Sequence, residues 1–325
     1  MIRKCSHLAT VVLMFSALLT SFTPVAADDY PSKPITMIVP FPAGGRTDVI
    51  GRFIAQYMQA AIGKPVAIVN KPGASSVLGS NEVADAKPDG YMLGFFSTSA
   101  VTAQYTVPTP LSLARFDLVA IVNADPAAIA VNESSKWQTL KDLVADAKAA
   151  PNSLKIGMIP GASAQIFAAG FSRAAGIDLI NVPFKGDADG AIALAGGHID
   201  IHVAVPVSYK SLVASKKVRM LAVASDARSD LYGNLPTYRE NGVPLSINAF
   251  HGVYVPAGTP EAIKNKIADA LKATLDNPEL KQRMNDAGAA AVYLKGQEAK
   301  DYLKVQDDTY REIIDALGLR VKPSN

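Results

Sequence analysis

The stretch from residue 35 to residue 48 constrains the fold more than any other part of the chain. Residues 35–39 are apolar and mostly β-branched or unbranched aliphatic, which is typical of a strand buried inside a parallel sheet. Pro40 and Pro42 end that strand because neither has an N–H group for a sheet ladder. Two glycines follow and permit a sharp turn. The stretch therefore predicts a strand, a tight loop and the start of a helix.

A helix whose apolar residues run from Ile50 to Ala61 is expected after the loop. Thr47 or Asp48 can cap it, its apolar residues recur at helical spacing, and Gly63 ends it. A helix start delivered by a Gly-rich loop is a ready anion site, because its N–H groups and its dipole face the loop. A purely structural connection has the same signature, so this motif alone leaves both interpretations open.

Length and composition indicate an ordinary globular protein with enough apolar material for two cores. The chain has 325 residues, of which 49% are hydrophobic and 19% are charged. Lys and Arg number 32 against 29 Asp and Glu, and without Arg3 and Lys4 the excess falls to one. No broad basic field results, so we expect no nucleic-acid partner.

Residues 1–27 resemble a secretory signal peptide. Arg3 and Lys4 form a basic start, residues 8–19 are apolar but too short to span a bilayer, and small residues precede Asp28. We expect cleavage after Ala27 and a soluble protein in the periplasm, the alternative being a retained membrane anchor. The single cysteine lies before the apolar run, so the mature chain would contain no thiol for disulfides, metals or catalysis.

Strands and helices alternate along the chain in two series. The first has strands at 65–70 and 91–96, a helix at 77–86, an irregular segment at 100–117, and apolar runs at 118–123 and 127–131. The second has helices at 140–149, 163–175, 188–195 and 209–214, and strands at 154–158, 179–183, 198–205 and 218–225. Helices at 260–275, 278–287 and 297–317 and a strand at 290–294 finish the chain.

This alternation predicts parallel pairing with right-handed crossovers. We therefore predict an α/β fold of two doubly wound domains with a cleft between them. The first domain would comprise residues 28–125 and 250–325, and the second would comprise residues 126–249. Ligands of such sheets bind beyond the carboxyl ends of the strands, where the loops at 40–45 and 97–99 should be neighbours.

The second series contains a counterpart of the opening loop. Residues 157–163 again end a strand and open a helix, with Ala162 or Ser163 in the first turn. Two such helix starts facing each other across a cleft could hold one carboxylate through backbone N–H groups. The alternative is that both loops are only short connections.

Enzyme signatures are weak. His198 and His202 would lie on one face of a strand about 13 Å apart, which is too far for one metal ion. The run 161–165 lacks the final glycine of a nucleophile elbow, and no nucleotide-binding glycine motif occurs. We predict no catalytic residue, cofactor or metal. A secreted α/β hydrolase using Ser163 remains the rival interpretation.

Seven motifs occur in one order along almost the whole mature chain. They are Tyr30-Pro-Ser-Lys-Pro-Ile35, Val39-Pro-Phe-Pro-Ala-Gly-Gly45, Asn70-Lys-Pro-Gly-Ala74, Lys87-Pro-Asp-Gly-Tyr91, Val182-Pro-Phe-Lys-Gly186, Gly196-Gly-His-Ile-Asp200 and Val255-Pro-Ala-Gly-Thr-Pro260. In these motifs the sequence resembles the Bug-type periplasmic solute-binding receptors of tripartite tricarboxylate transporters. The resemblance implies a Venus-flytrap fold of the periplasmic-binding-protein type. It also implies a monomer that delivers a small carboxylate to a large and a small membrane permease subunit.

The resemblance also implies where the ligand binds. One carboxylate would be held by the first loop and its helix start, at Phe41, Ala43, Gly44, Gly45, Thr47 and Asp48. The second helix start contributes Gly161, Ala162, Ser163 and Ala164. The remaining walls would come from Ser97, Thr98, Ser99, Lys185 and Gly186.

Three departures from the family pattern bear on the ligand. Arg46 stands where relatives often have a small or hydroxyl residue, and it would either pair with a second carboxylate or point to solvent. The loop at 157–163 lacks an early serine, and no histidine follows it. The segment 203–206, with Ala204, is apolar, which favours a ligand with an apolar or aromatic body. A sensing role beside a membrane kinase uses the same kind of trap and stays open.

Overall fold

The computed structural model describes residues 30–160 and 162–321, and the predicted signal peptide at 1–27 lies outside these residues. From Pro31 onward the chain forms one compact unit. Within the described ranges, no helix has both the length and the apolar character needed to cross a membrane.

The first sheet has six strands in the order β11-β4-β10-β3-β1-β2. Their bounds are β1 Ile35–Val39, β2 Val66–Asn70, β3 Met92–Ser97, β4 Phe116–Pro126, β10 Asn248–Pro256 and β11 Ala291–Lys295. The strands β1, β2 and β3 are parallel, as predicted, whereas β10 runs antiparallel to both β3 and β4. The sheet is therefore mixed, because a late strand returns between two early ones.

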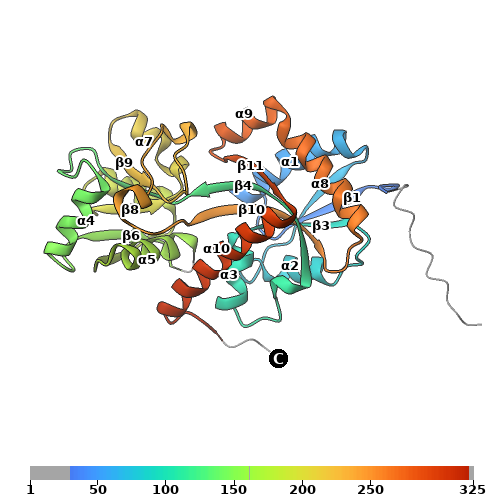
Figure 1. The fold of residues 1–325 in the computed structure, drawn as a ribbon, viewed down its shortest axis with the longest axis horizontal. Coiled ribbons are helices and arrows are strands. Elements are labelled where there is room, and N and C mark those ends of the chain that lie inside the picture. Colours follow the sequence, from blue (N-terminus) through green and yellow to red (C-terminus); the bar gives the residue numbers. More distant parts are fainter. Residues whose placement is uncertain (1–29, 161, 322–325) are drawn as a thin grey trace, which may run out of the picture. The chain divides into compact units, whose positions relative to one another are not determined.

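Helices cover both faces of this sheet. They are α1 Arg46–Ile62, α2 Val77–Ala84, α3 Thr98–Thr106, α8 Glu261–Asp276, α9 Pro278–Asp286 and α10 Gly296–Ala316. The helices α1 and α8 lie side by side (Figure 1). On the other face, Val77 and Ala100 pack with Phe96 and Tyr254 in one apolar cluster.

The expectation of an irregular segment at 100–117 is wrong in its first part. Helix α3 occupies Thr98–Thr106. The hydroxyl of Ser97 accepts the Ser99 N–H at 3.3 Å, so the polar residues that suggested a loop form a helix cap. The prolines at 108 and 110 follow this helix.

The second sheet has five strands in the order β7-β6-β8-β5-β9. Its elements are β5 Ala128–Asn132, β6 Lys155–Met158, β7 Ile180–Pro183, β8 Ile201–Ala204, β9 Val218–Val223, α4 Leu140–Ala149, α5 Ser163–Ala175, α6 Asp187–Ala195 and α7 Lys210–Ala214. Strand β5 shows the period of two expected of a buried strand. Ile129 and Val131 join the core on the side of α4 and α5, and Ala128 and Ala130 join the core beneath α6.

The two histidines weighed as metal ligands do not share a strand. Strand β8 begins at Ile201, so His198 lies before it and is exposed. His202 is fully buried, and its Nδ1 lies 3.0 Å from the Tyr209 hydroxyl. Among the described residues, no group of three or more His, Cys, Asp or Glu side chains could hold a metal ion.

The two sheets are joined where β4 passes into β5 and where the chain returns into β10. Only Ala127 separates β4 from β5. Ala127 N–H donates to the Ile247 carbonyl at 3.0 Å, Ile247 N–H donates to Ala224 at 3.0 Å, and Ala224 N–H donates to Ala127 at 2.7 Å. We call these three residues the backbone triangle.

The last helix packs against residues of both predicted domains, so the domain boundaries stay a prediction. Helix α10 falls in the predicted first domain, yet its Tyr310 and Ile313 belong to a core cluster that contains Phe171 of α5. That cluster also includes Ile121 of β4 and Phe250 of β10. The strands divide cleanly between two sheets, whereas the apolar core is continuous across them.

Candidate functional site

Four helices begin around one small cavity of about 180 Å³. They are α1, α3, α5 and α6, two from each sheet. The cavity is lined by Phe41, Arg46, Thr47, Ser97, Thr98, Ser99, Ser163, Ala164, Phe167, Asp187, Ala204, Val205, Ala249, Phe250 and His251.

The helix starts give the cavity an electropositive backbone. Helices α1, α5 and α6 are preceded by Gly45, Ala162 and Gly186, and none of these three has a side-chain cap. Each helix end favours a negative charge by about 0.3–1 kcal/mol when exposed, and by up to about 2 kcal/mol when partly buried. Chemically, such an arrangement can bind a small anion.

The first loop is held in place by Asp48, which lies behind the cavity. Its buried carboxylate accepts hydrogen bonds from Gly44 N–H at 2.8 Å, Arg52 Nε at 2.9 Å and Asn70 Nδ2 at 2.8 Å. Burial opposes ionisation, but these donors outweigh it and the pKa of Asp48 is lowered. Gly44 takes a φ of +82°, which favours glycine. Asp48 is therefore a residue that positions the loop.

The side of the cavity that belongs to the first sheet is its first wall. Five side chains in and behind this wall form a closed circuit, which we call the polar ring. Arg46 Nη2 bonds Asp125 Oδ2, and Asn123 Nδ2 donates to the same oxygen at 3.0 Å. The Asn123 Oδ1 lies 2.7 Å from His251 Nδ1, and His251 Nε2 lies 3.2 Å from the Thr47 hydroxyl. Thr47 and Arg46 are neighbours in the first turn of α1, which closes the circuit.

Strand pairing brings the polar ring together. His251 lies opposite Ser97 of β3 and opposite Asn123 of β4. The register of β4 and β10 shifts between His251 and Gly252, so that Val122 has no partner in the ladder. Such a bulge beside a site redirects the side chains around it. The ring of His251 also stacks on Phe95, with ring centres 5.3 Å apart.

Burial sets the protonation of the polar ring. Burial, together with the smaller effect of the nearby Arg46 charge, lowers the pKa of His251 to about 3. The imidazole of His251 is therefore neutral. Its Nδ1–H donates to the amide oxygen of Asn123, and its Nε2 accepts a hydrogen bond from the Thr47 hydroxyl. Burial raises the pKa of Asp125, and the Arg46 charge and the Ala290 N–H at 2.8 Å oppose that rise.

Arg46 does not simply point to solvent, and its pairing with a ligand carboxylate stays a prediction. Its Nη2 atom is taken by Asp125 and by the Gly288 carbonyl at 3.0 Å. Asp125 also receives the Tyr232 hydroxyl at 3.3 Å. Arg46 lines the cavity, but its charge is paired from behind by an aspartate that is only 1% exposed.

The side of the cavity that belongs to the second sheet is its second wall, and Asp187 is the acidic side chain that lines it. It is the first residue of α6, and the Ser208 side chain hydrogen-bonds to it. Its Oδ1 is buried and has no hydrogen-bond partner. Burial raises the pKa of Asp187, against the Arg46 charge and the Ser208 hydrogen bond.

The rest of the cavity surface is apolar. It comes from three phenylalanines and four small aliphatic residues on both sheets: Phe41, Phe167, Phe250, Ala164, Ala204, Val205 and Ala249. A ligand of this cavity would be enclosed mostly by hydrocarbon, with polar groups at the helix starts and at His251 of β10.

The structure brings nine of the predicted site residues to the cavity: Phe41, Arg46, Thr47, Ser97, Thr98, Ser99, Ser163, Ala164 and Ala204. It does not bring these seven to the lining: Ala43, Gly44, Gly45, Asp48, Ala162, Lys185 and Gly186. The loop glycines and Ala162 supply backbone geometry next to the lining. Gly161 lies outside the described residues.

Five lining residues were missed, and a sixth, Val205, was expected only as part of the apolar segment 203–206. The five are Phe167, Asp187, Ala249, Phe250 and His251. Helical spacing could have found Phe167, because it lies one turn after Ser163. Asp187 directly follows Lys185 and Gly186 and could have been included. No local signal points to the three residues of β10, because only its pairing beside β3 places them here.

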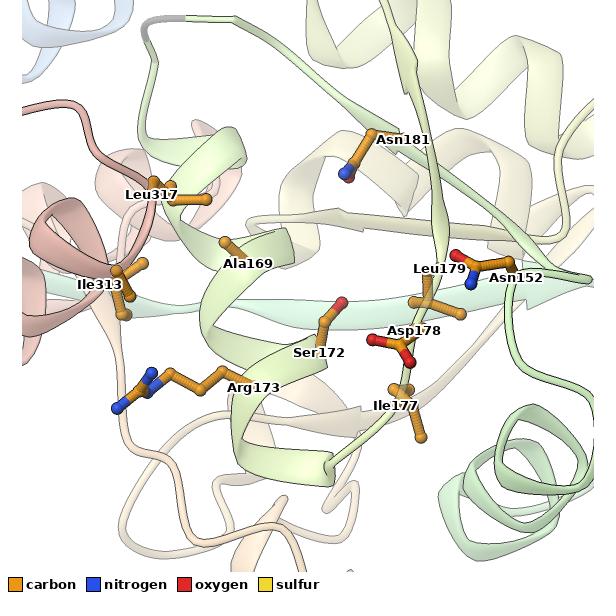
Figure 2. Close-up of a pocket in the computed structure, with 11 residues that line it drawn as sticks. Asn152, Ala169, Ser172, Arg173, Ile177, Asp178, Leu179, Asn181, Ile313 and Leu317 are labelled. Atoms are coloured by element: carbon orange, nitrogen blue, oxygen red, sulfur yellow. The ribbon is translucent and has the colours of Figure 1, made fainter.

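A hollow of about 340 Å³ elsewhere is built differently. Figure 2 shows it between α5, β7 and the end of α10, with Arg173 and Asp178 on opposite sides. A third hollow, of about 460 Å³, lies beside Tyr232 and Gly288. Neither hollow contains a predicted site residue, and none of the helices α1, α3, α5 and α6 begins at them.

Comparison with known proteins places this geometry in a class. Residues 50–319 match the family described as tripartite tricarboxylate transporter family receptor. The chain is 30% identical over 286 residues to an Agrobacterium vitis UPF0065 protein from the ttuE–ttuC′ intergenic region, covering 87% of this chain and 83% of that protein. The class is that of periplasmic solute-binding receptors, which are not enzymes. The chain belongs to the family of tripartite tricarboxylate transporter receptors.

Solved structures agree with this assignment. A TctC solute-binding protein from Polaromonas, solved without ligand, is 30% identical and has a TM-score of 0.83, covering 88% of this chain and 99% of its own. The R. palustris protein Rpa4515, solved with adipate, is 25% identical with a TM-score of 0.71, covering 89% and 99%. MatC from Rhodopseudomonas palustris, solved with bound malate, is 25% identical with a TM-score of 0.66, covering 88% and 100%. The expected two-domain α/β fold of the periplasmic-binding-protein type is confirmed.

Proposed function

We propose that this receptor captures a small carboxylate in the cavity at the four helix starts and delivers it to the membrane subunits of a tripartite transporter. The observation that carries the proposal is the convergence of α1, α3, α5 and α6, three of them without a side-chain cap. Anions bind at helix N-termini because free N–H groups and the helix dipole favour negative charge. Related receptors solved with adipate and malate support the same ligand class.

The lining also bears on the shape of the ligand. Three phenylalanines and a volume of about 180 Å³ favour one compact apolar or aromatic body over a polyhydroxylated one. We infer that the residues of the cavity lining, including the nine predicted ones, contact this ligand. The receptor would act as a periplasmic monomer after cleavage behind Ala27, with residues 28–125 and 250–325 forming one domain and residues 126–249 the other.

Thermal unfolding of the mature chain against a panel of carboxylates tests the proposal. A ligand at about 100 times its Kd stabilises the folded state by about 2.7 kcal/mol, which shifts the melting temperature visibly. The panel pairs each acid with its uncharged amide, for example benzoate with benzamide and succinate with succinamide. A shift with acids and not with amides supports capture of a carboxylate, and a shift with no acid contradicts it.

Transport is tested separately from capture. Co-purification of the loaded receptor with the large and small permease subunits in membranes would support delivery to a transporter. Binding of the loaded receptor to a membrane kinase and not to the permease would favour the sensing role instead.

A further inference from the structure

We propose that the ligand is zwitterionic: a small carboxylate whose apolar body also carries a protonated amine, which Asp187 binds. The inference rests on the proposed function and names its ligand class more closely. The observation behind it is the buried Oδ1 of Asp187, which lies in the cavity wall without a hydrogen-bond partner.

A buried carboxylate oxygen without a hydrogen-bond partner costs free energy, because it has lost its hydrogen bonds to water and gained none in the protein. The Ser208 hydroxyl donates a hydrogen bond to Asp187, but one hydroxyl does not compensate a buried negative charge. Asp187 takes part in no ion pair within the described part of the chain. We therefore infer that a bound ligand supplies the missing hydrogen-bond donor from the cavity side.

Arg46 does not fill that need. It stands in the opposite wall. Its Nη2 is occupied by Asp125 and the Gly288 carbonyl, and its buried Nε, which has no partner, does not bond Asp187 either. The Arg46 charge favours the ionised form of Asp187, but no hydrogen bond or ion pair joins the two side chains in the described part of the chain. The negative charge of Asp187 is therefore only partly compensated. A second ligand carboxylate would be repelled there, whereas an ammonium group would be attracted.

The four helix starts divide the cavity into two polar zones. Asp187 is itself the first residue of α6, so the start of that helix already has a carboxylate beside it. The starts of α1 and α5 carry no acidic side chain against the cavity, since Asp48 of α1 lies behind it. The ligand carboxylate belongs at α1 and α5, and its amine belongs at Asp187.

Calorimetric titration of the mature chain with matched ligand pairs tests this division. The pairs are leucine with 4-methylpentanoate, phenylalanine with 3-phenylpropanoate, and 4-aminobutanoate with butanoate, so that the amine position varies. In at least one pair, we expect the amine to bind more tightly by about tenfold or more, since charge-assisted hydrogen bonds are about twice as strong as neutral ones.

Two variants separate a specific contact from a general effect. Asp187→Asn should weaken the amine about 10- to 100-fold and leave the matched acid within about threefold. Asp189→Asn is the control, because Asp189 is exposed in the same first turn of α6 and does not line the cavity. It should leave both affinities unchanged.

The outcomes distinguish this inference from the function beneath it. If the simple acids bind as well as or better than their amines in every pair, the zwitterion is wrong and carboxylate capture stands. Equal weakening of both members by Asp187→Asn also overturns it, because Asp187 would then only shape the cavity. If the folded chain binds neither the amines nor any carboxylate, the proposed function itself fails.

Discussion

The two walls of the cavity differ in how their buried polar side chains are hydrogen-bonded. In the first wall, every member of the polar ring is bonded to another: Arg46 to Asp125, Asn123 to His251, and Thr47 back to His251. In the second wall, Asp187 keeps one oxygen without a partner. The side chains of the polar ring therefore hold one another, although the buried Nε of Arg46 also lacks a partner. In the second wall, we propose that the ligand supplies the missing partner of Asp187. The comparison teaches that one sheet can supply a rigid wall of the cavity while the other supplies the group that selects the ligand.

The sharpest way to break this comparison is to make the same substitution in each wall. Asp125→Asn leaves the Arg46 charge unpaired, and should cost about 3 kcal/mol, at the low end for a broken buried pair because the Arg46 side chain is 31% exposed. Asp187→Asn removes a buried charge that lacks a full set of partners, and should leave the free energy of unfolding unchanged or raise it. Urea unfolding of both variants measures the difference, and equal losses would remove the distinction between the walls.

Acid should weaken the first wall through His251. Its pKa is lowered to about 3 in the folded chain against about 6.5 when unfolded. The unfolded state therefore binds more protons between these values, so stability is complete above about pH 6.5 and falls as the pH is lowered towards 3. Between pH 6.5 and 5 the loss from this residue is at most about 2 kcal/mol.

The pH dependence of urea unfolding in variants assigns that loss. His251→Gln should flatten the dependence, although buried His202, whose pKa is lowered to about 4, will retain part of it. Exposed His198→Gln serves as the control and should leave the curve as it is. An unchanged slope in His251→Gln would show that the histidine is not the group responsible.

Opening the polar ring at Thr47 should have a smaller effect. Thr47→Val keeps the shape but removes the hydroxyl that His251 Nε2 accepts, leaving a buried acceptor unsatisfied at a cost of about 1–2 kcal/mol. Thr47→Ser keeps the hydroxyl and should recover most of that loss. Chemical denaturation of the two variants gives the answer, and equal stability would mean that the contact with His251 contributes nothing.

The smallest effect is expected in the second wall. Ser208→Ala removes the side-chain hydrogen bond to Asp187 from a half-buried position, and should cost under about 1 kcal/mol. The same melting experiments detect it. A loss as large as that of Asp125→Asn would show that the second wall is also held by its own side chains.

Much of the fold could be predicted from the sequence because its signals are local. The run 35–39 and the two prolines place β1 at its observed bounds. The start of α1 was predicted two or three residues late, because Gly45 precedes the helix and neither Thr47 nor Asp48 caps it. The second helix start, α5 at Ser163, follows from the same kind of signal. Helix α3 was missed because Ser97 caps it, and a serine in a cap has the same local sequence as a serine in a loop.

The candidate site was predictable only where one segment builds it. The loop before α1 and the residues at 97–99 reach the cavity as expected. The partners of Arg46 were not predictable, because Asp125 lies 79 positions away and Gly288 lies 242 positions away. His251 enters the ring because β10 inserts between β3 and β4, which a strand's own sequence does not reveal.

The backbone triangle has a mechanical consequence for a receptor of this class. Ala127, Ala224 and Ile247 each donate to another of the three at 2.7–3.0 Å where the strands leave one sheet for the other. The connection between the sheets is therefore held by backbone hydrogen bonds at these residues. A change in the angle between the sheets would have to distort these bonds or bend the chain outside them. A stiff connection of this kind would resist such a movement.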